Sequence, residues 1–469
     1  MSTRVVHILR YGTVAEKAHL EKAISAYDYL SINGNTAAYV STAIAGFVVD
    51  KFFTKPDKGF FIDPITYAFQ KEIRLLKSES KATGEKKIKK SVEKLIDKYG
   101  YPVDKVRKDV SIEPSDFRVD ADKEPFCRRV LDFQYNLVNE HLKENDLEKY
   151  LDYVAPNGTE SIPQFRPKFL IAPYFFLDLD DSNYEQWLGL NLDFIKIAAQ
   201  QAQELFDGCP VFAQIVISKS LFENRAKLDG LAEAYNHSNC NGITIWVDDL
   251  NEHESSYQDL RGFVYLLQKL HGTRPIYNMY GGYFSVLLTN KRIQLLNGVS
   301  HGLEYGESRK VYPVGGGIPV SKYYFYPLHQ RLDFTKAFYL LEHTGAIDIS
   351  LDNWGSPSKY YHEVCRCGQC QKIIKEDMIN FVEFESKDYY EIRIKDRVQR
   401  RKKASSDTKE NCLYHYLLCK KKEFLRVGKN SLADLLADLA TQKEQYTHCT
   451  ALVDGELDYM DTWQRVLKG

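Results

Sequence analysis

The sequence predicts an α/β fold, a (β/α)8 barrel, from two observations. Eight short apolar runs recur along the chain, each ended by a polar residue, and several are followed by an amphipathic segment of helical period. Continuous apolar runs are typical of strands buried on both faces of a parallel sheet. Eight such units favour a closed barrel whose chemistry lies on the loops after the strands. An open doubly wound sheet is the structural alternative.

The predicted strands, in chain order, span residues 59–63, 169–178, 211–217, 242–248, 275–280, 298–302, 322–326 and 346–352. Amphipathic helices are expected at 182–205, 256–270 and 333–343. This divides the chain into an N-terminal region with the first strand (1–70), a helical, lysine-rich insertion (71–165), strands two to eight (166–352), a cysteine-bearing subdomain with a basic run (353–427) and a closing segment (428–469). The closing segment contains a predicted helix at 431–445 whose apolar face is Leu432, Leu435, Leu436 and Leu439.

Composition excludes some classes of protein. The 469 residues carry 63 basic and 64 acidic side chains, which excludes a protein that is basic all over but not one with a local basic face. No apolar run reaches 18 residues, so we expect no membrane span. The first residues lack the apolar core of a signal peptide, and only nine cysteines occur. We therefore expect a reducing, cytoplasmic location.

The strongest local signal is Cys365-x-Cys367-x-x-Cys370. Three thiolates this close repel one another unless a cation holds them, and Zn²⁺ prefers four soft ligands in a tetrahedron. The first choice for the fourth ligand is His415, with Cys412 and Cys419 as alternatives. A site whose four positions are all filled by protein is structural, so we expect structural zinc here; the plain alternative is three incidental thiols in a loop.

Acidic residues end several predicted strands: Asp63, Asp178, Asp180, Asp248 and Asp352. Each alone is as well explained by capping of the next helix or turn. Several converging on one barrel mouth favour chemistry, because nearby carboxylates can divide acid, base and nucleophile roles between them.

Two further stretches suggest binding. Gly302, Gly306 and Glu307 follow a predicted strand, where glycines let the backbone approach a flat ligand and the carboxylate can bond its edge. The basic run at 393–403 could contact phosphates, chiefly through Arg400, Arg401, Lys402 and Lys403. A solvated surface is the alternative for this run.

Together these motifs resemble the guanine transglycosylase family, which exchanges guanine in a polynucleotide for a 7-deazaguanine base. In that family an Asp ending the first strand is followed by Phe-Gln, as Asp63 is here by Phe69-Gln70. The family's Gly-Gly-Leu-x-Val-Gly-Glu loop is similar to the stretch from Gly302 and Leu303 to Gly306 and Glu307. Its Gly-Ile-Asp-x-Phe-Asp strand resembles 345–352, and its Cys-x-Cys-x-x-Cys zinc motif follows that strand.

The resemblance implies a mechanism and a site. Asp352 would attack the sugar C1′, with Asp348 as the other candidate nucleophile, and Asp63 would act as general acid and base. Asp180 and Gln214 would bond the base edge of a flipped-out nucleoside, beside Gly302, Leu303, Glu307, Phe69 and Gln70. Partners would be DNA or tRNA and a guanine or 7-deazaguanine base. The tRNA relatives are dimers, which favours a homodimer.

The chain also departs from the family. Its second strand-eight Asp is displaced by one residue, the basic stretch after the nucleophile is missing, and a long segment separates Cys370 from His415. These departures favour the DNA-modifying branch over the tRNA enzymes. The main rival is a non-catalytic, nucleic-acid-binding zinc barrel that serves as partner subunit of a modification or defence system. A metal-dependent hydrolase would need clustered His ligands, whereas His301 and His329 are isolated.

Overall fold

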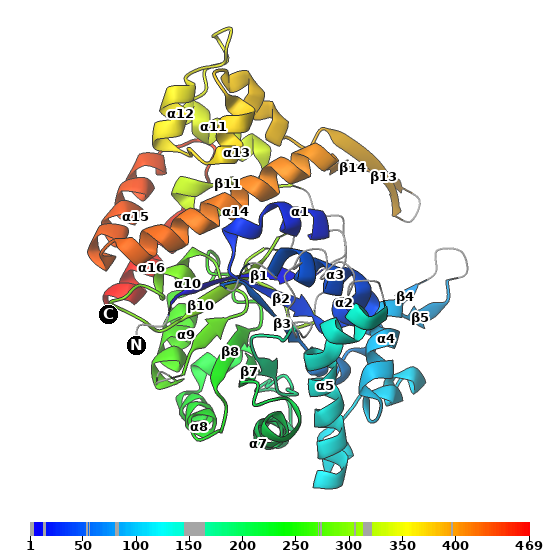
Figure 1. The fold of residues 1–469 in the computed structure, drawn as a ribbon. Helices are drawn as coiled ribbons and strands as arrows, with labels where there is room; N and C mark the ends of the chain where they lie inside the picture. The colour runs from blue at the N-terminus through cyan, green and yellow to red at the C-terminus, as the bar shows by residue number, and fades with distance from the viewer. Residues whose placement is uncertain are drawn as a thin grey trace, which may run out of the picture.

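Eight parallel strands form one sheet in the computed structural model (Figure 1). The model describes residues 4–12, 16–52, 55, 57–79, 84–144, 165–270, 272, 274–303, 306–312, 321–394 and 397–469. The strands are β1 (Val6–Tyr11), β2 (Tyr29–Asn33), β3 (Gly59–Asp63), β6 (Leu170–Ile171), β7 (Val211–Ile217), β8 (Gly242–Val247), β9 (Ile276–Asn278) and β10 (Gly298–Gly302).

Around the sheet the strands follow one another in chain order. Their spatial order is β3-β2-β1-β10-β9-β8-β7-β6, with every pair parallel. The two edge strands of this order, β3 and β6, also approach each other. The backbone N–H of Lys168, just before β6, donates to the carbonyl of Phe60 in β3 at 2.8 Å. The sheet is therefore a nearly closed barrel, and the predicted fold class is confirmed.

Successive side chains along each strand point alternately into the barrel and outward toward the helices, and so belong to two separate hydrophobic cores. Ile8, Phe61, Phe212 and Trp246 belong to a cluster inside the barrel. Their strand neighbours pack outward against the helices, as Leu9 does in β1. An inward side chain at the end of a strand therefore enters the barrel mouth.

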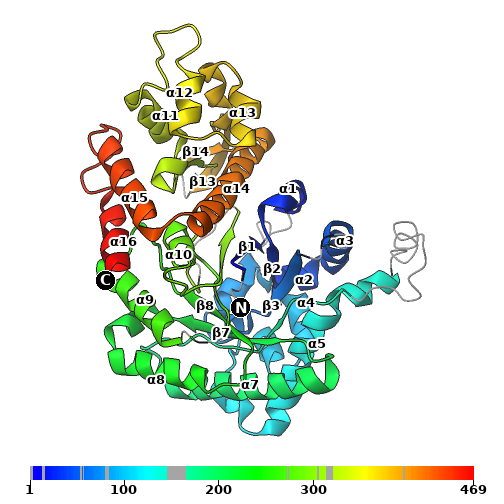
Figure 2. The same cartoon turned by 60° about the vertical axis from the view of Figure 1, so that its left-hand side comes forward.

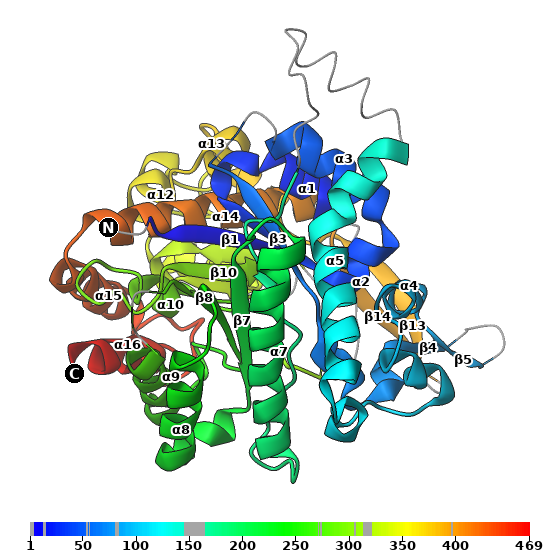
Figure 3. The same cartoon turned by 60° about the horizontal axis from the view of Figure 1, so that its bottom comes forward.

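Helices cover the barrel, as Figures 2 and 3 show from two further sides. Those before the eighth strand are α1 (Lys17–Lys22), α2 (Gly34–Tyr39), α3 (Ser41–Phe52), α4 (Lys90–Tyr99), α5 (Asp120–Glu144), α7 (Tyr184–Leu205), α8 (Arg225–Asn236), α9 (Tyr257–Leu270) and α10 (Tyr283–Leu287). Those after it are α11 (Phe334–His343), α12 (Pro357–Glu363), α13 (Gly368–Ile374), α14 (Ser406–Lys429), α15 (Leu432–Tyr446) and α16 (Asp458–Lys468). No helix within these ranges is both long and apolar enough to cross a bilayer.

Short elements complete the chain. Three antiparallel hairpins pair β4 (Lys77–Glu79) with β5 (Lys86–Ile88), β11 (Tyr323–Phe325) with β12 (Gln330–Leu332), and β13 (Asp388–Ile394) with β14 (Arg397–Lys403). The 3-10 helices are Ile24–Ala26, Thr66–Phe69, Ile73–Leu76, Val103–Lys108, Pro114–Phe117, Lys219–Glu223, Tyr326–Leu328 and Met378–Phe384.

The predicted numbering of the strands is wrong by two. The run at 59–63 is the third strand, because β1 and β2 precede it, and the insertion at 71–165 follows this third strand rather than the first. Both missed strands carry inward polar side chains, Arg10 and Ser31, which interrupt the apolar runs used to find strands. The run at 298–302 is consequently the eighth strand.

The last two predicted strands lie outside the barrel. Residues 322–326 contribute β11, which pairs only with β12 among the described strands. Residues 346–352 form turns: Asp348 accepts hydrogen bonds from the N–H and hydroxyl of Ser350, and Ile349 and Leu351 are 59% and 49% exposed. An Asp that bonds its own backbone two residues on favours a turn over a strand.

Helix α14 takes the place of the helix that follows strand eight. The Ser405 side chain caps it by accepting from the N–H of Thr408 at 3.1 Å. Phe424 stacks on His7 of β1 with ring centroids 4.5 Å apart, and Tyr416 meets His301 of β10 edge-on at 5.6 Å. The predicted helices at 182–205, 256–270, 333–343 and 431–445 correspond to α7, α9, α11 and α15, whose leucine face is buried.

Candidate metal centre and barrel mouth

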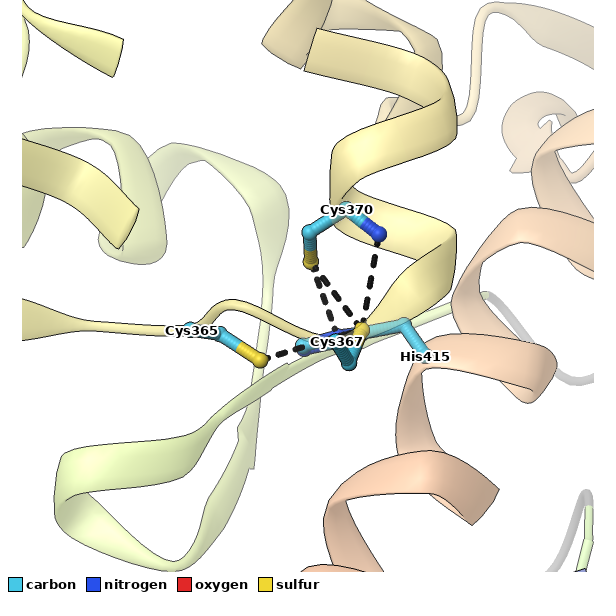
Figure 4. Close-up of side chains that lie close together, drawn as sticks. All are labelled: Cys365, Cys367, Cys370 and His415. Atoms are coloured by element: carbon cyan, nitrogen blue, oxygen red, sulfur yellow. Dashed lines mark hydrogen bonds between the residues drawn. The ribbon is translucent and has the colours of Figure 1, made fainter. Parts of the chain in front are cut away.

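Three cysteines and one histidine converge in the unit that follows the eighth strand (Figure 4). Cys365 and Cys367 precede α13, Cys370 lies in its first turn, and His415 comes from α14. The four ligand atoms lie within 4.8 Å of one another. His415 Nδ1 is 3.2 Å from the sulfur of Cys370 and 3.4 Å from that of Cys367.

The donor set fits a metal ion. Ligands of a tetrahedral zinc ion, with bonds of about 2.0 Å to nitrogen and about 2.3 Å to sulfur, lie roughly 3.5 Å apart, close to the spacing seen here. His415 Nε2 bonds the carbonyl of Tyr324 at 2.7 Å, which leaves Nδ1 facing the sulfurs, as is usual for a metal-bound histidine. The cluster can hold a metal ion, and His415, the first choice from sequence, completes it.

The two alternative ligands lie in different surroundings. Cys419, one helical turn after His415, has its sulfur 3.6 Å from that of Cys365 and borders the cluster. Cys412 donates to the carbonyl of Phe384 at 3.5 Å instead. Four protein ligands close the site to substrate, so a bound ion would join the segment around α13 to α14.

The barrel mouth contains a buried ion pair. Arg10, inward on β1, lies 3.0 Å from Asp63 Oδ2 at the end of β3, and both side chains are almost fully buried. Asp63 Oδ1 accepts from the hydroxyl of Tyr174 at 2.5 Å, and Asn33 of β2 accepts from Arg10. This places Asp63 at the mouth, as predicted, with both its carboxylate oxygens engaged.

A second carboxylate follows β8. Asp248 has the inward parity of Trp246, and its Oδ1 accepts from the N–H of Val311 at 2.6 Å. Burial raises the pKa of Asp248, against the effect of that hydrogen bond. The two mouth carboxylates thus differ: Asp63 is paired with a cation and Asp248 is held by a backbone N–H.

Aromatic rings fill the space around these groups. Trp246 lies 4.7 Å from Tyr280 and 5.3 Å from Tyr67, centroid to centroid. The Arg10 guanidinium lies 4.6 Å from the centroid of Tyr280. Arg309, after β10, donates to the Tyr280 hydroxyl at 3.1 Å. Aromatic rings and guanidinium groups together are suited to a flat, polar ligand.

Below the mouth, Gln214 of β7 is buried and accepts from the Thr244 hydroxyl at 2.6 Å. Its amide nitrogen has no hydrogen-bond partner among the residues that the structure describes. Gln214 is therefore inside the barrel, where the sequence interpretation placed it, with one donor unused.

The loop after β10 contacts α14. Glu307 lies 2.6 Å from the ammonium of Lys420 and accepts from the Tyr416 hydroxyl at 3.0 Å. The carbonyls of Gly302 and Leu303 accept from Arg331, and the Gly302 N–H donates to the carbonyl of Gly306 at 3.0 Å. Beside the loop is a cleft of about 560 Å³, lined in part by Glu307, Arg331 and Tyr416.

Buried charges continue behind this loop. Lys420 also pairs with Glu423 at 3.0 Å, and Glu423 accepts from His329 at 2.7 Å. Burial opposes the charge of Lys420, but Glu307 and Glu423 outweigh it and raise the pKa of Lys420. Burial raises the pKa of the neighbouring Glu252 to about 7. Burial lowers the pKa of His329, which is thus a hydrogen-bond partner of Glu423 within a protein network.

Other predicted site residues lie away from the mouth. Asp348 and Asp352 are exposed in the turns of residues 346–352, so they cannot end the eighth strand, and the expectation that either reaches the barrel mouth from it is wrong. Asp180 is exposed in the turn before α7. Gln70 bonds both the N–H and the carbonyl of Phe176, and Phe69 packs in the outer core near Tyr99. Gln70 therefore holds the loop after β6 in place, and Phe69 packs against α4.

The basic run forms the β13–β14 hairpin. Arg400 is exposed and stacks on Tyr389 at 4.1 Å, Lys402 lies 3.3 Å from Glu385, and Lys403 is exposed. The side chain of Arg401 lies outside the described residues. The hairpin offers at least three cations from one short segment.

Sequence interpretation missed Arg10, Tyr174, Arg309 and the α14 charges. The cysteine motif can be recognised without knowing how the strands pair. Arg10 can be recognised as a mouth residue only once β1 is known to be a barrel strand. A polar residue at an inward position of a short apolar run, as in Val6–Tyr11, was the available signal. Comparison of the chain with protein-family models and with curated proteins finds no match.

Proposed function

We propose that the chain exchanges guanine in a polynucleotide for a 7-deazaguanine base, with DNA preferred over tRNA and the barrel mouth as active site. The observation that carries the proposal is the pair of unlike carboxylates, Asp63 and Asp248, at the ends of two barrel strands beside an aromatic lining. The Cys3His cluster after strand eight, taken as structural zinc, agrees with the resemblance in the motifs. The preference for DNA rests on that resemblance.

The surroundings of the carboxylates suggest their roles. The Arg10 cation beside Asp63 can stabilise the negative charge of an attacking group, and a carboxyl whose pKa is raised, as that of Asp248 is, is suited to carrying a proton. We therefore assign the attack on C1′ to Asp63 and the acid–base role to Asp248. This differs from the sequence-based assignment, which gave Asp63 the acid–base role and Asp352 the attack.

The reaction then has two balanced halves. The Asp63 carboxylate forms a bond to C1′ as the glycosidic bond breaks, and the departing guanine takes the proton of Asp248. In the second half the ring nitrogen of the incoming base loses its proton to Asp248 and displaces Asp63 from C1′. Gln214 and Tyr280 line the path of a flipped-out base. The β13–β14 hairpin would contact phosphates.

The test is incorporation of labelled guanine. Purified protein is incubated with labelled guanine and with duplex DNA, single-stranded DNA or tRNA, and the polymer is counted after removal of free base. We expect label in DNA above that in tRNA. No label in any polymer, under conditions where the protein binds one of them, would reject the exchange.

A second function is favoured by one observation. The true eighth strand, β10, ends in Gly302 and is followed by Leu303, with no carboxylate where the resemblance implies the attacking Asp. This favours the rival, a nucleic-acid-binding zinc barrel that acts as a partner subunit. Binding without incorporation in the same assay would support it.

A further inference from the structure

The metal cluster has a fifth donor beside it. Cys419 lies in α14 one helical turn after His415, so the two side chains project from the same face of the helix. The Cys419 side chain is fully buried. Its sulfur lies 3.6 Å from that of Cys365 and 3.6 Å from His415 Nδ1. A tetrahedral ion takes four ligands, so five donors are one more than the site can use at once.

The distances divide the five donors into two groups that share His415 Nδ1. On one side, the sulfurs of Cys367 and Cys370 lie 3.4 Å from each other, and 3.4 Å and 3.2 Å from Nδ1. On the other side, the sulfurs of Cys365 and Cys419 lie 3.6 Å from each other, and 3.9 Å and 3.6 Å from Nδ1. Two ligands of one tetrahedral zinc ion are roughly 3.5 Å apart. Cys365 and Cys419 therefore lie side by side, each at ligand spacing from His415.

The surroundings of the Cys419 thiol differ from those of buried thiols elsewhere in the protein. Four of the others donate to a backbone carbonyl: Cys127, Cys209, Cys412 and Cys449. Within the described part of the chain, Cys419 contacts no such carbonyl, and its sulfur contacts Cys365 and His415 instead. A buried thiol is normally satisfied by an acceptor, and here the neighbours are themselves donors to a metal. This is the environment of a ligand.

Exchange of Cys365 for Cys419 keeps the chemistry of the site. Either set consists of three thiolates and one imidazole, so the charge and the softness of the ligands stay the same. What changes is the segment that the ion holds, because Cys365 follows α12 whereas Cys419 belongs to α14. Cys367 and Cys370 have no such substitute, since the contacts of Cys419 are with Cys365 and His415.

We propose that Cys419 is an alternative metal ligand, which can take the place of Cys365 in a site otherwise formed by Cys367, Cys370 and His415. The ion then has two complete sets of ligands rather than one, and loss of Cys365 leaves the second set intact. The inference concerns the metal cluster alone and does not depend on base exchange.

The test is zinc binding by cysteine variants of the full-length protein, with zinc content measured after dialysis and affinity measured by competition with a chelator. Cys365→Ser should still hold one zinc ion per chain, with an affinity within about tenfold of wild type, because four ligands remain. Cys365→Ser/Cys419→Ser should bind zinc about a hundredfold more weakly than Cys365→Ser, because only three ligands remain. Cys365→Ser/Cys412→Ser is the matched control and should retain zinc, since Cys412 lies in α14 but bonds Phe384.

Cobalt provides a second readout. Loaded with Co²⁺, wild type and Cys365→Ser should show thiolate-to-cobalt charge-transfer bands of equal intensity, because each supplies three sulfurs, and Cys365→Ser/Cys419→Ser should show weaker bands. Loss of zinc by Cys365→Ser, or equal retention of zinc by the two double variants, would overturn the inference. If Cys365→Ser does not fold with zinc present, judged by circular dichroism, Cys365→Ala decides. None of these outcomes bears on base exchange, which incorporation of labelled guanine measures separately.

Discussion

The guanidinium of Arg10 lies 3.0 Å from the carboxylate of Asp63, and the two buried side chains join the first strand of the barrel to the third. The pair crosses over β2, whose Asn33 also accepts from Arg10. Because both ends are desolvated, removing one partner leaves an uncompensated charge inside the barrel.

The first prediction concerns this pair. Arg10→Met should lower the free energy of unfolding by about 3–5 kcal/mol, since Asp63 stays buried without its cation. The double variant Arg10→Met/Asp63→Asn should be less destabilised than the Arg10 single variant. Urea unfolding of the two variants and of wild type measures this. Equal losses in single and double variants would mean that the ion pair does not couple the strands.

The second prediction concerns the metal. Cys370→Ser should abolish binding of one zinc ion per chain and unfold the segment around α13, because folding and metal binding are linked. Metal analysis and limited proteolysis measure the two effects. Cys127→Ser is the matched control, since Cys127 is equally buried but lies in α5, away from the cluster. A Cys370→Ser protein that retained its metal would contradict the assignment.

The sequence predicted the barrel, four helices and the three cysteines of the candidate metal cluster because each depends on a short-range pattern. Cys365 to Cys370 is a local motif, and the leucine face of α15 repeats at the helical period. The numbering of the strands failed because Arg10 and Ser31 are polar side chains at inward positions, and only the pairing of β1 with β2 in the barrel shows that both point inward. Ala346 and Ile347 are buried like strand residues, yet Asp348 turns the chain at once. Asp352 therefore looked catalytic only through an incorrect strand.

The third prediction is a pH dependence from Glu252. Burial raises the pKa of this carboxyl to about 7 in the folded chain, from an ordinary value of 4.5. Between these values the folded state binds more protons than the unfolded state, so this group's contribution to stability falls as pH rises from about 4.5 to 7. The full loss is roughly 3 kcal/mol, at about 1.4 kcal/mol per pH unit.

Glu252→Gln should remove that loss. Relative to wild type, the variant should gain stability as pH rises from 5 to 7.5, measured by urea unfolding at each pH. The exposed neighbour Glu254 provides the control. The free energy of unfolding of Glu254→Gln should change between pH 5 and 7.5 as that of wild type does. A Glu252→Gln protein whose difference from wild type is the same at pH 5 and 7.5 would show that the carboxyl is ionised across this range.

The fourth prediction concerns the β13–β14 hairpin. Replacing Arg400, Arg401, Lys402 and Lys403 with Ala should weaken polynucleotide binding, and the slope of log affinity against log salt should fall by about one unit per lost phosphate contact. The exposed pair Lys291 and Arg292, in the loop before β10 and so at the end of the barrel away from the mouth, serves as control when changed to Ala. An unchanged slope would identify the hairpin as ordinary solvated surface.

The last prediction separates the carboxylates of the proposed exchange. Asp248→Asn should reduce guanine incorporation by about 10²–10⁴-fold, because an amide cannot carry the proton that the leaving base requires. Asp249→Asn, which changes the adjacent residue paired with Lys310, should retain activity within a fewfold. Asp352→Asn should also remain active, since this carboxyl lies in an exposed turn outside the barrel.

Asp63→Asn should abolish both incorporation and any covalent adduct trapped on the protein, whereas Asp248→Asn should still allow an adduct to form slowly. If Asp352→Asn alone lost activity, the barrel mouth would not be the active site. If Asp63→Asn and Asp248→Asn both retained full incorporation, neither carboxylate would perform the chemistry assigned to it.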